Sequence, residues 1–410
     1  MKNDKKQKGD EIYSQDFYEL CNTVKAREKS LRIKKYNFKL RFTVALLFSI
    51  CLVSMYFIKF QFENLVNFMP KTFFYENGLY VHFIDVGQGK AIAVRTDDGT
   101  NILIDCGKEI EKHKLFGYLE QNFFASDNAE KVFDYFILTH SDSDHIGNSV
   151  EIFEKYEIKN CYRPKVYTPA EAELYGITNS YQINNTDLYS NFVNALNNEN
   201  CNVLYNFAGE SISGINYIFE FLTPMKNAYS NSNSYSPIIS LTYNYDILSE
   251  LVETENLDAE PDTKKFVFTG DATLTTELEA LNYNASELKA DVLDISHHGS
   301  NSSSTQDFLN AVNPEYAVIS VGENNYGLPA DEVSERLMLS GVNFEKIIRT
   351  DKLGTIIFHI NPLGELSILY ETGTYLNISD YAFAEVIISL ELFVLVICFA
   401  SYIPEKKQVI

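Results

Sequence analysis

Short apolar runs separated by turns dominate the central part of the chain. Leu79–Val86, Ala91–Thr96 and Asn101–Asp105 predict strands, and an Asp-Asp-Gly-Thr turn joins the last two as an antiparallel hairpin. Further strands are predicted at 133–138, 266–268, 292–295, 317–321, 355–360 and 366–370. Helical spacing is visible at 187–196, whereas 163–235 as a whole and 246–263 are expected to be surface excursions. At least nine strands with helices between them predict an α/β fold class.

Three of these runs end in side chains that bind metals. The first leads into His140, Asp142, Asp144 and His145, the second into Asp271, and the third into His297 and His298. Strands that present polar residues at their tips are a common way to build a site on a rigid scaffold. The chain has seven histidines, and four of them lie in these two clusters. The other three, His82, His113 and His359, are expected to be ordinary core or surface residues.

The composition is that of a folded protein, with 45% apolar and 22% charged residues. The six cysteines form no CxxC pair, which argues against a zinc ribbon or a disulfide scaffold, although a Cys161–Cys201 disulfide stays open. Charge is distributed unevenly: residues 1–41 carry a net charge of +6, and residues 60–381 carry −28. An acidic body argues against gripping a long polyanion, because nucleic-acid affinity comes mainly from Lys and Arg.

Two apolar segments flank the acidic body. Phe42–Ile58 has 17 residues without a charge and follows a Lys/Arg-rich stretch, which predicts a transmembrane anchor with its basic side in the cytoplasm and the body outside. A cleaved signal peptide is disfavoured by the long preceding tail. The segment 382–403 contains Glu385 and Glu391 and predicts a second crossing, with an interfacial or partner-binding helix as the alternative. The expected organisation is: cytoplasmic tail 1–41, anchor 42–59, linker 60–75, hydrolase domain 76–375 and second helix 382–403.

The His140–His145 segment has the spacing of a metal site. Two imidazoles and two carboxylates at alternating positions can converge on cations from one turn. A calcium loop fits less well, because Ile146 occupies the next ligand position and no Glu closes the loop. Asp271 and His297 would be enough to complete two adjacent metal sites. Two such metals can hold a hydroxide between them and hydrolyse an ester.

A series of motifs in a fixed order resembles the metallo-β-lactamase fold, an αββα sandwich of binuclear metallohydrolases. The resemblance is closer still to the extracellular hydrolase domain of the ComEC family of DNA-uptake competence proteins, and it covers roughly residues 79–372. The motifs are His82-Phe-Ile-Asp85-Val-Gly87-Gln88-Gly89, Leu-Ile-Asp105, Leu-Thr-His140-x-Asp142-x-Asp144-His145, Thr-Gly-Asp271, Ser296-His297-His298-Gly299-Ser300, Ile-Ser-Val-Gly322, Asn325-Tyr326-Gly327 and Arg349-Thr-Asp351.

The resemblance implies a role for each matching residue. It implies a first metal held by His140, Asp142 and Asp271, and a second held by Asp144, His145, Asp271 and His297, with Asp271 bridging. Of the histidine pair, His297 is favoured as the ligand and His298 as the group that contacts a phosphate oxygen or protonates the leaving group, with the reverse left open. Candidate catalytic residues are therefore Asp144 and His298. Asp85, Asp105 and Ser296 would support the ligands, and Ser300, Asn325 and Tyr326 would bind substrate.

The sequence departs from the family pattern at several positions. Asp142 stands where the broad superfamily has His, and no His occurs between 145 and 297, so the third imidazole of the first site is missing. The segment Asn231–Ser240 could supply an oxygen in its place. Lys90 stands where the family usually has an acid, and Leu328 where it usually has a His. A local basic patch around Lys90, Arg95 or Arg349 could still receive a short substrate.

These features predict a membrane-anchored, outward-facing phosphodiesterase or nuclease-type metallohydrolase. The expected partners are a phosphoester substrate, with nucleic acid among the candidates, and membrane lipid. A choline phosphodiester of the cell wall is an alternative, because the 27 Tyr could supply aromatic faces for a quaternary ammonium. A catalytically weak binding module that kept the fold is a second alternative. β-Lactamase chemistry ranks lower, since it relies on an imidazole-rich first site.

Replacing imidazoles by carboxylates gives the first site more hard oxygen ligands. Of the two expected divalent ions, Zn²⁺ is favoured in general, but Mn²⁺ or Mg²⁺ is predicted to compete with it at the first position. Metal analysis of the purified protein tests this prediction. Zn²⁺ alone at about two equivalents per chain would contradict it.

Overall fold

The computed structural model describes residues 19–20, 22–43, 75–125, 131–245 and 263–371. The chain divides into two units, and the catalytic candidates all lie in the unit formed by residues 70–375. In the other unit, residues 22–43 form a helix. The predicted spans 42–59 and 382–403 lie outside the described residues, apart from positions 42 and 43. No helix within the described ranges combines the length and apolar character needed to cross a membrane.

Two sheets form the centre of the larger unit. The first has eight strands in the order β15-β14-β1-β2-β3-β4-β5-β6, and the second has seven in the order β13-β12-β11-β10-β9-β8-β7. The first sheet contains β1 (Leu79–Phe83), β2 (Ile92–Arg95), β3 (Asn101–Ile104), β4 (Val132–Ile137), β5 (Glu157–Arg163), β6 (Asn202–Tyr205), β14 (Thr355–Ile360) and β15 (Leu366–Glu371). The second contains β7 (Ser211–Ser213), β8 (Tyr217–Phe221), β9 (Ile239–Asn244), β10 (Thr263–Phe268), β11 (Val292–Asp294), β12 (Tyr316–Ile319) and β13 (Ile347–Arg349).

Side-chain alternation along the strands separates three hydrophobic layers. In β1, Leu79, Val81 and Phe83 point into the core between the sheets, whereas Tyr80 points to the outer helices. In β10, Phe266 and Phe268 enter the same inter-sheet core from the other side. Both faces of each sheet are therefore covered, which explains the nearly continuous apolar runs in the sequence.

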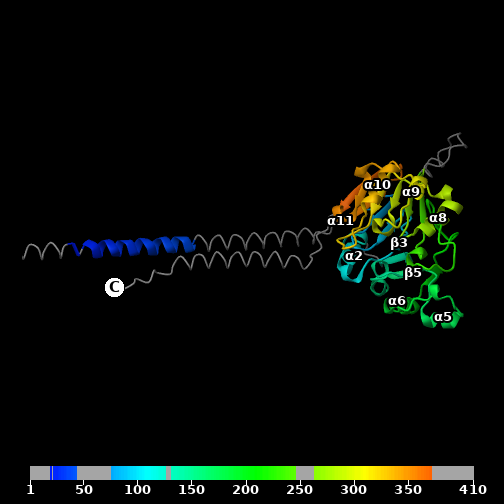
Figure 1. Cartoon of the computed structure of the whole chain (residues 1–410), viewed down its shortest axis with the longest axis horizontal. Helices are drawn as coiled ribbons and strands as arrows, with labels where there is room; N and C mark the ends of the chain where they lie inside the picture. The colour runs from blue at the N-terminus through cyan, green and yellow to red at the C-terminus, as the bar shows by residue number, and fades with distance from the viewer. Residues whose placement is uncertain (1–18, 21, 44–74, 126–130, 246–262, 372–410) are drawn as a thin grey trace, which may run out of the picture. The chain divides into compact units, whose positions relative to one another are not determined.

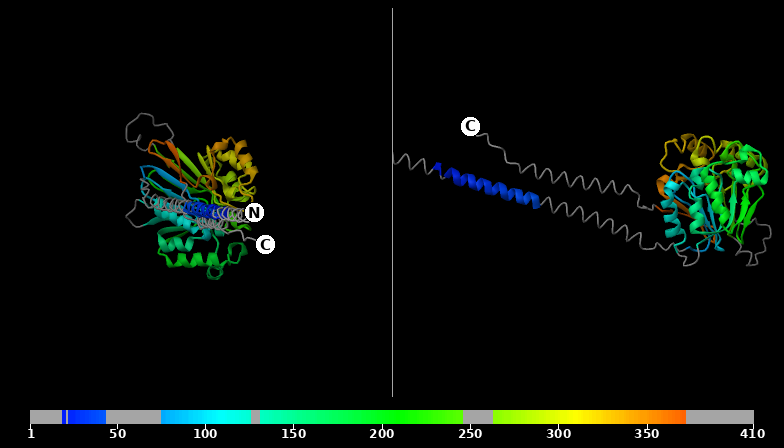
Figure 2. Two further views of the ribbon diagram at one scale, coloured as in Figure 1. Left: turned by 90° about the vertical axis from the view of Figure 1, so that its left-hand side faces the viewer. Right: turned by 90° about the horizontal axis from the view of Figure 1, so that it is seen from below.

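Helices cover the outer face of each sheet and complete an αββα sandwich, as the sequence predicts. The first sheet carries α2 (Lys112–Tyr118), α4 (Ser149–Lys155) and α6 (Asp187–Asn198). The second carries α8 (Leu274–Tyr283), α9 (Gln306–Val312) and α10 (Asp331–Leu339). Figure 1 shows α6 on one side of the sheets and α8–α10 on the opposite side, and Figure 2 gives two further views. The remaining helices are α3 (Ser143–Ile146), α5 (Pro169–Tyr175) and α11 (Thr350–Leu353).

The expectation that 163–235 is a surface excursion is wrong. This stretch contributes β6, β7 and β8 to the sheets, and α6 buries Tyr189, Phe192, Val193 and Leu196 along one face. Its many Tyr and Asn side chains resemble surface composition, but several of the tyrosines bury their rings and bond their hydroxyls internally. The Tyr189 hydroxyl, for example, donates to the Val166 carbonyl at 2.7 Å.

The three cysteines of the described region have free thiols. Cys106 and Cys161 are buried, and Cys201 is partly buried. The Cys161–Cys201 disulfide left open by the sequence is therefore not formed in this structure.

A buried ion pair fixes the start of the segment 163–235. The Arg163 guanidinium is 2% exposed and donates to both carboxylate oxygens of Glu171, at 2.8 and 3.0 Å. It also donates to the Val166 carbonyl at 2.6 Å. Glu171 in turn caps α5, where Thr168 and Glu171 form a reciprocal capping box. The arginine thus joins the end of β5 to the beginning of α5.

We predict that Arg163→Leu lowers the free energy of unfolding by about 3–5 kcal/mol, because it leaves the Glu171 carboxylate half-buried without its partner. Lys112→Met is the matched control, since the Lys112–Glu151 pair is 53% and 28% exposed and should contribute under about 1 kcal/mol. Urea unfolding followed by circular dichroism measures both. Equal effects of the two substitutions would contradict the prediction.

Candidate metal centre

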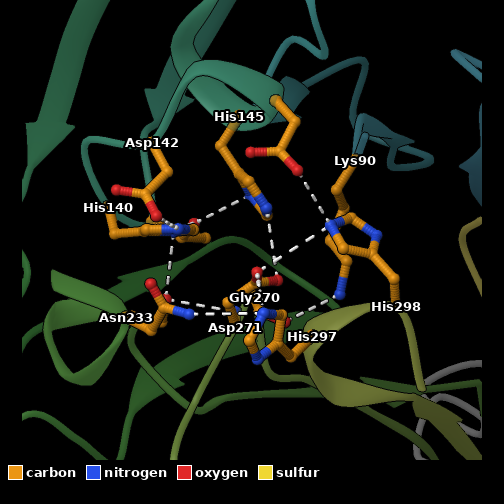
Figure 3. Close-up of polar contacts among 12 residues, drawn as sticks. Lys90, His140, Asp142, His145, Asn233, Gly270, Asp271, His297 and His298 are labelled. Carbon is orange, nitrogen blue, oxygen red and sulfur yellow. Dashed lines mark hydrogen bonds and ion pairs between the residues drawn. The ribbon is translucent and has the colours of Figure 1, made fainter. Parts of the chain in front are cut away.

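The candidate centre lies where strand tips of the two sheets meet. From the first sheet, β3 leads into Asp105, and β4 leads into His140 and the short helix α3, which carries Asp144 and His145. From the second sheet, β10 leads into Asp271 and β11 into His297 and His298. Figure 3 shows His140, His145, Asp271 and the two adjacent histidines gathered around one space. His145 Nε2 lies 3.2 Å from Asp271 Oδ1, and His298 Nε2 lies 3.4 Å from Asp144 Oδ2. The structure thus brings together three loops that are far apart in the sequence.

Asp105 sets the orientation of His145. Its Oδ2 lies 2.6 Å from His145 Nδ1, so this nitrogen donates to the carboxylate. Asp105 also accepts from the backbone N–H and the hydroxyl of Thr139, both at 2.8 Å. With Nδ1 occupied, the Nε2 of His145 faces Asp271. An imidazole held by a carboxylate behind it is the usual arrangement of a metal ligand.

His140 is oriented by a similar chain of hydrogen bonds. Because the Thr139 hydroxyl donates to Asp105, it accepts from His140 Nδ1 at 3.0 Å. Ser236 Oγ also lies 3.2 Å from this nitrogen. The Nε2 of His140 is therefore left with its lone pair and lies 3.7 Å from Asp142 Oδ2. The tautomers of His140 and His145 follow from the hydrogen-bond network.

The two adjacent histidines occupy different environments. His298 is buried, and its Nδ1 donates to the Ser320 carbonyl at 2.7 Å, which directs its Nε2 toward Asp144 and Asp271. The side chain of His297 is 30% exposed, and its Nε2 lies 3.7 Å from Asp271 Oδ2. This geometry favours the alternative division of roles, in which His298 is the ligand and His297 faces substrate.

The polar atoms of the cluster fit a pair of cations. His140, His145 and Asp271 offer ligand atoms within 4.8 Å of one another, and so do Asp144, His145 and His298. His140 Nε2, His145 Nε2, His298 Nε2 and Asp271 Oδ1 are buried and make no hydrogen bond apart from the 3.2 Å approach of His145 to Asp271. Buried lone pairs of this kind are costly unless a proton or a metal ion lies between them. The chemistry of the donor set, imidazole with carboxylate, matches Zn²⁺ and Mn²⁺.

The electrostatics favour ionised carboxylates. Burial by itself would raise the pKa of Asp271, but the imidazoles of His145 and His298 hold that pKa well below its usual range. Burial would likewise lower the pKa of His145, yet the carboxylates of Asp271 and Asp105 hold it well above its usual value. The pKa of Asp144 is also lowered, with His298 and His145 outweighing burial. A proton and a metal ion therefore compete for the same space between His145 and Asp271.

Strained backbone holds several of these residues. Asp105, His297 and His298 have φ values of 58°, 52° and 53°, in a region that non-glycine residues rarely adopt. Such conformations persist where the surroundings over-determine them and are concentrated at functional sites. Gly270 has a φ of 52°, and a Cβ there would lie 2.9 Å from Thr139 Cβ. A glycine is therefore required directly before Asp271.

The segment Asn231–Ser240 does reach the centre. Asn233 is 9% exposed, lies in η4 (Ser232–Tyr235), and places its Nδ2 3.5 Å from His297 Nε2. Figure 3 shows Asn233 next to His140 and Asp271, on the side where an imidazole is missing. Ser236 Oγ accepts from the Asp271 N–H at 3.1 Å. The only sequence signal for Asn233 and Ser236 is the lack of a histidine between 145 and 297.

Lys90 lies under the centre and not at its surface. Its side chain is fully buried, and Nζ donates to Asp294 Oδ2 and the Gly270 carbonyl, both at 2.8 Å, and to the Ile295 carbonyl at 3.2 Å. It therefore ties together the tips of β10 and β11, just before Asp271 and His297. Burial raises the pKa of Asp294 even though Lys90 opposes this shift. The sequence signal for this pair is a single charged residue at the end of each of two apolar strands, with no opposite charge beside it in the sequence.

The expected basic patch around Lys90, Arg95 and Arg349 is not present. Lys90 is buried, Arg95 lies over the Tyr75 ring with 4.3 Å to its centroid, and Arg349 forms a two-point ion pair with Asp351 at 2.7 and 2.9 Å. Each of these three basic side chains already contacts a carboxylate or an aromatic ring. Leu328, at the other departure from the family pattern, packs against the hydrophobic core of the second sheet.

Only some of the predicted supporting and substrate-binding residues contact the cluster or the turns that carry it. Ser296 Oγ donates to the Ala272 carbonyl at 2.7 Å and so links β11 to the Asp271 turn. Asp85 contacts Gly87 N–H and Lys114 Nζ and none of the predicted ligands, so its predicted support of the metal loop is not seen. Ser300 bonds Ser302, whose hydroxyl lies 3.5 Å from His297 Nδ1. Asn325 and Tyr326 are exposed in the loop after β12, and no contact places them at the cluster.

We predict that Lys90→Met destabilises the fold by about 3–5 kcal/mol, because it leaves Asp294 as an uncompensated buried charge. The double variant Lys90→Met/Asp294→Leu should regain much of the stability, yet bind divalent metal about 10- to 100-fold more weakly, since the Gly270 carbonyl has lost its anchor. Thermal unfolding and metal titration separate the two effects. Wild-type metal affinity in the double variant would contradict a positioning role.

Comparison with known proteins agrees with this geometry. Residues 84–198 match the family model described as the Metallo-beta-lactamase superfamily. The chain is 26% identical over 308 residues to ComE operon protein 3 of Bacillus subtilis, covering 72% of this chain and 35% of that protein. It is 27% identical over 294 residues to competence protein ComA of Neisseria gonorrhoeae, covering 70% and 33%. The chain thus spans about a third of the length of these relatives.

Among solved structures, the metallo-beta-lactamase fold protein YhfI from Bacillus subtilis covers 69% of this chain and 100% of its own at 11% identity, with a TM-score of 0.39. The resemblance predicted from the motifs is confirmed by the sequence comparisons. Residues 84–198 are thus similar to the metallo-β-lactamase superfamily, and over most of its length the chain is similar to ComEC-family competence proteins.

Proposed function

We propose that this domain is a binuclear metal-dependent hydrolase of phosphodiester bonds. The observation that carries the proposal is the convergence of four buried ligand atoms at the strand tips of the two sheets, with no hydrogen-bond partner outside this cluster. Hydrogen bonds from behind turn the Nε2 atoms of His140 and His298 toward the same space, which supports a cation site there.

In this proposal the ligands divide into two sets that share Asp271. The first cation would be held by His140, Asp142 and Asp271, with the Asn233 carboxamide as the oxygen in place of the missing imidazole. The second would be held by Asp144, His145, Asp271 and His298. The placement of Asp271 supports bridging, because its Oδ1 lies 3.2 Å from His145 Nε2 in the second set, and its ligand atom also lies within 4.8 Å of that of His140 in the first.

When bound, a pair of divalent cations supplies Lewis acidity and an activated water for in-line displacement at phosphorus. The chain's own residues orient the substrate. His297 stands at the open side of the cluster, where its partly exposed ring can donate to a phosphate oxygen or to the leaving oxygen. The Asn233 amide lies close enough to hold a second phosphate oxygen. Asp105 and Thr139 keep the ligand imidazoles in place.

Nucleic acid is the substrate class that the relatives suggest, since their names describe competence proteins. The acidic body supports a short or single-stranded substrate over a long duplex, and the engaged arginines strengthen that preference. A small choline phosphodiester and a metal-binding module without turnover are the competing functions.

We also propose that the domain is attached to the membrane and faces outward. The support is the order of a basic tail, the uncharged segment 42–58 and an acidic body along the chain. Protease treatment of intact cells tests this: the domain is expected to be cut without lysis. Protection until lysis would rule the orientation out.

We predict that full-length protein with Mn²⁺ hydrolyses bis-p-nitrophenyl phosphate and single-stranded DNA, and that Asp271→Ala abolishes both activities. His298→Ala should lose about one equivalent of bound metal, because a ligand is removed. His297→Ala should retain both metals but lower kcat by about 10²- to 10⁴-fold, as expected for a lost proton donor.

Steady-state kinetics and elemental analysis of each variant provide the measurements. If Asp271→Ala and wild type show the same metal-dependent rate, the hydrolase proposal fails. If His297→Ala loses metal while His298→Ala keeps it, His297 is the ligand and His298 is the proton donor. Tight metal binding without turnover on either substrate would identify the binding module.

A further inference from the structure

A pocket of about 240 Å³ adjoins the metal centre on the side of Asp142. Ser141, which lies between His140 and Asp142 in the sequence, forms part of its lining, together with Ser232. The Ser232 hydroxyl lies 3.5 Å from Asp142 Oδ2. A group bound in the pocket would therefore be within reach of a phosphate held at the first metal. This volume is below that of typical drug-sized sites and suits one ring system.

Two loops form the rest of the wall, and internal hydrogen bonds fix both of them. The Tyr235 hydroxyl donates to the Tyr181 carbonyl at 2.7 Å, which joins the loop at 229–235 to η3 (Ser180–Gln182). The Tyr229 hydroxyl donates to Glu279 Oε2 at 2.7 Å, and the Tyr229 N–H donates to the Tyr235 hydroxyl at 3.1 Å. The pocket is therefore built before any ligand binds.

The lining is uncharged and offers polar groups that are free to bond a ligand. No Lys, Arg, Asp or Glu side chain is among the lining residues, all of which fall in the described part of the chain. The hydroxyls of Ser141, Ser180 and Ser230 and the Asn185 carboxamide make no hydrogen bond to other described residues. The Asn184 carboxamide has its oxygen bonded to Thr186 at 2.8 and 2.9 Å, which leaves its N–H₂ group as a donor.

An aromatic ring stands at the rim. Tyr181 is 58% exposed and has no ring partner among the described residues. Tyr229 and Tyr235, by contrast, are buried and pack edge to face on each other with 5.3 Å between centroids. The pocket therefore has a single free aromatic surface flanked by amide and hydroxyl groups.

We infer that this pocket binds an unpaired nucleobase adjacent to the scissile phosphate, an inference that rests on the proposed phosphodiesterase function. A phosphate would need cations in the lining, and a quaternary ammonium would need several open ring faces or a carboxylate. A base needs a ring to stack on and neutral donors and acceptors for its edge, and the pocket supplies both. The substrate class is accordingly single-stranded nucleic acid or a nucleotide ester.

The test measures binding and does not depend on turnover. Calorimetric titration of the full-length, metal-loaded protein with thymidine 5′-phosphate and with deoxyribose 5-phosphate compares ligands that differ only in the base. Thymidine 5′-phosphate is expected to bind about tenfold more tightly, equivalent to roughly 1.4 kcal/mol. Tyr181→Ala should remove that difference, and Asn185→Ala should reduce it. Tyr283→Ala, which truncates a tyrosine that is 71% exposed and outside the pocket, is the matched control and should keep it.

Several outcomes would overturn the inference. Equal affinity of the wild type for the two phosphates excludes a base site, as does an unchanged difference in Tyr181→Ala. Phosphocholine that binds more tightly than thymidine 5′-phosphate, and does so only with Tyr181 present, would assign the pocket to a quaternary ammonium. A base-dependent difference in a protein that hydrolyses no phosphodiester would support the base site while rejecting the proposed hydrolase activity.

Discussion

The candidate centre depends on one contact between the two sheets, the approach of His145 to Asp271 at 3.2 Å. His145 belongs to the first sheet and Asp271 to the second, so this contact exists only when the sandwich is closed. Asp105 holds His145 from behind at 2.6 Å, and the Ser236 hydroxyl accepts from the Asp271 backbone at 3.1 Å. Each lone pair is therefore directed at a space that the protein itself does not fill. Such an arrangement lowers the stability of the fold when no cation is bound and raises it when a cation binds.

Beneath the ligands, the fold uses buried charge and close backbone contact to set their positions. Lys90 bonds both Asp294 and the Gly270 carbonyl, so the turns that carry Asp271 and His297 share one anchor. A Cβ at Gly89 would come within 2.7 Å of the Asp144 carbonyl, so the chain packs directly on the ligand loop there. These contacts are rigid because no exposed side chain is involved. The open side of the centre is different: it is formed by His297, Asn233 and the neutral pocket next to Asp142, and it is where the proposed substrate would enter.

The sequence was informative where a local pattern has a single structural meaning. Apolar runs predicted the strands, and the hairpin of β2 and β3 followed from its turn residues. The sequence was misleading where the same residue types occur both at the surface and in the interior. The Tyr- and Asn-rich stretch 163–235 has the composition of a surface, yet Tyr189 is fully buried with its hydroxyl bonded to a carbonyl. Lys90 was a candidate substrate contact, yet Asp294, which lies at the tip of a different strand, neutralises it in the interior.

The sequence by itself determined which residues could bind metal and that strand tips would present them, because ligand type and strand period are properties of the local chain. It could not divide the roles of His297 and His298. Adjacent residues have the same local signal, and only the positive φ at both positions together with the bond from His298 to the Ser320 carbonyl turns one ring inward and leaves the other partly exposed. The tertiary structure also decided which residue lies where the imidazole is missing, since the approach of Asn233 depends on contacts of its segment with residues that are 64 and 90 positions away in the chain. Pairing over such distances is set by closure of the whole sandwich, which no local pattern encodes.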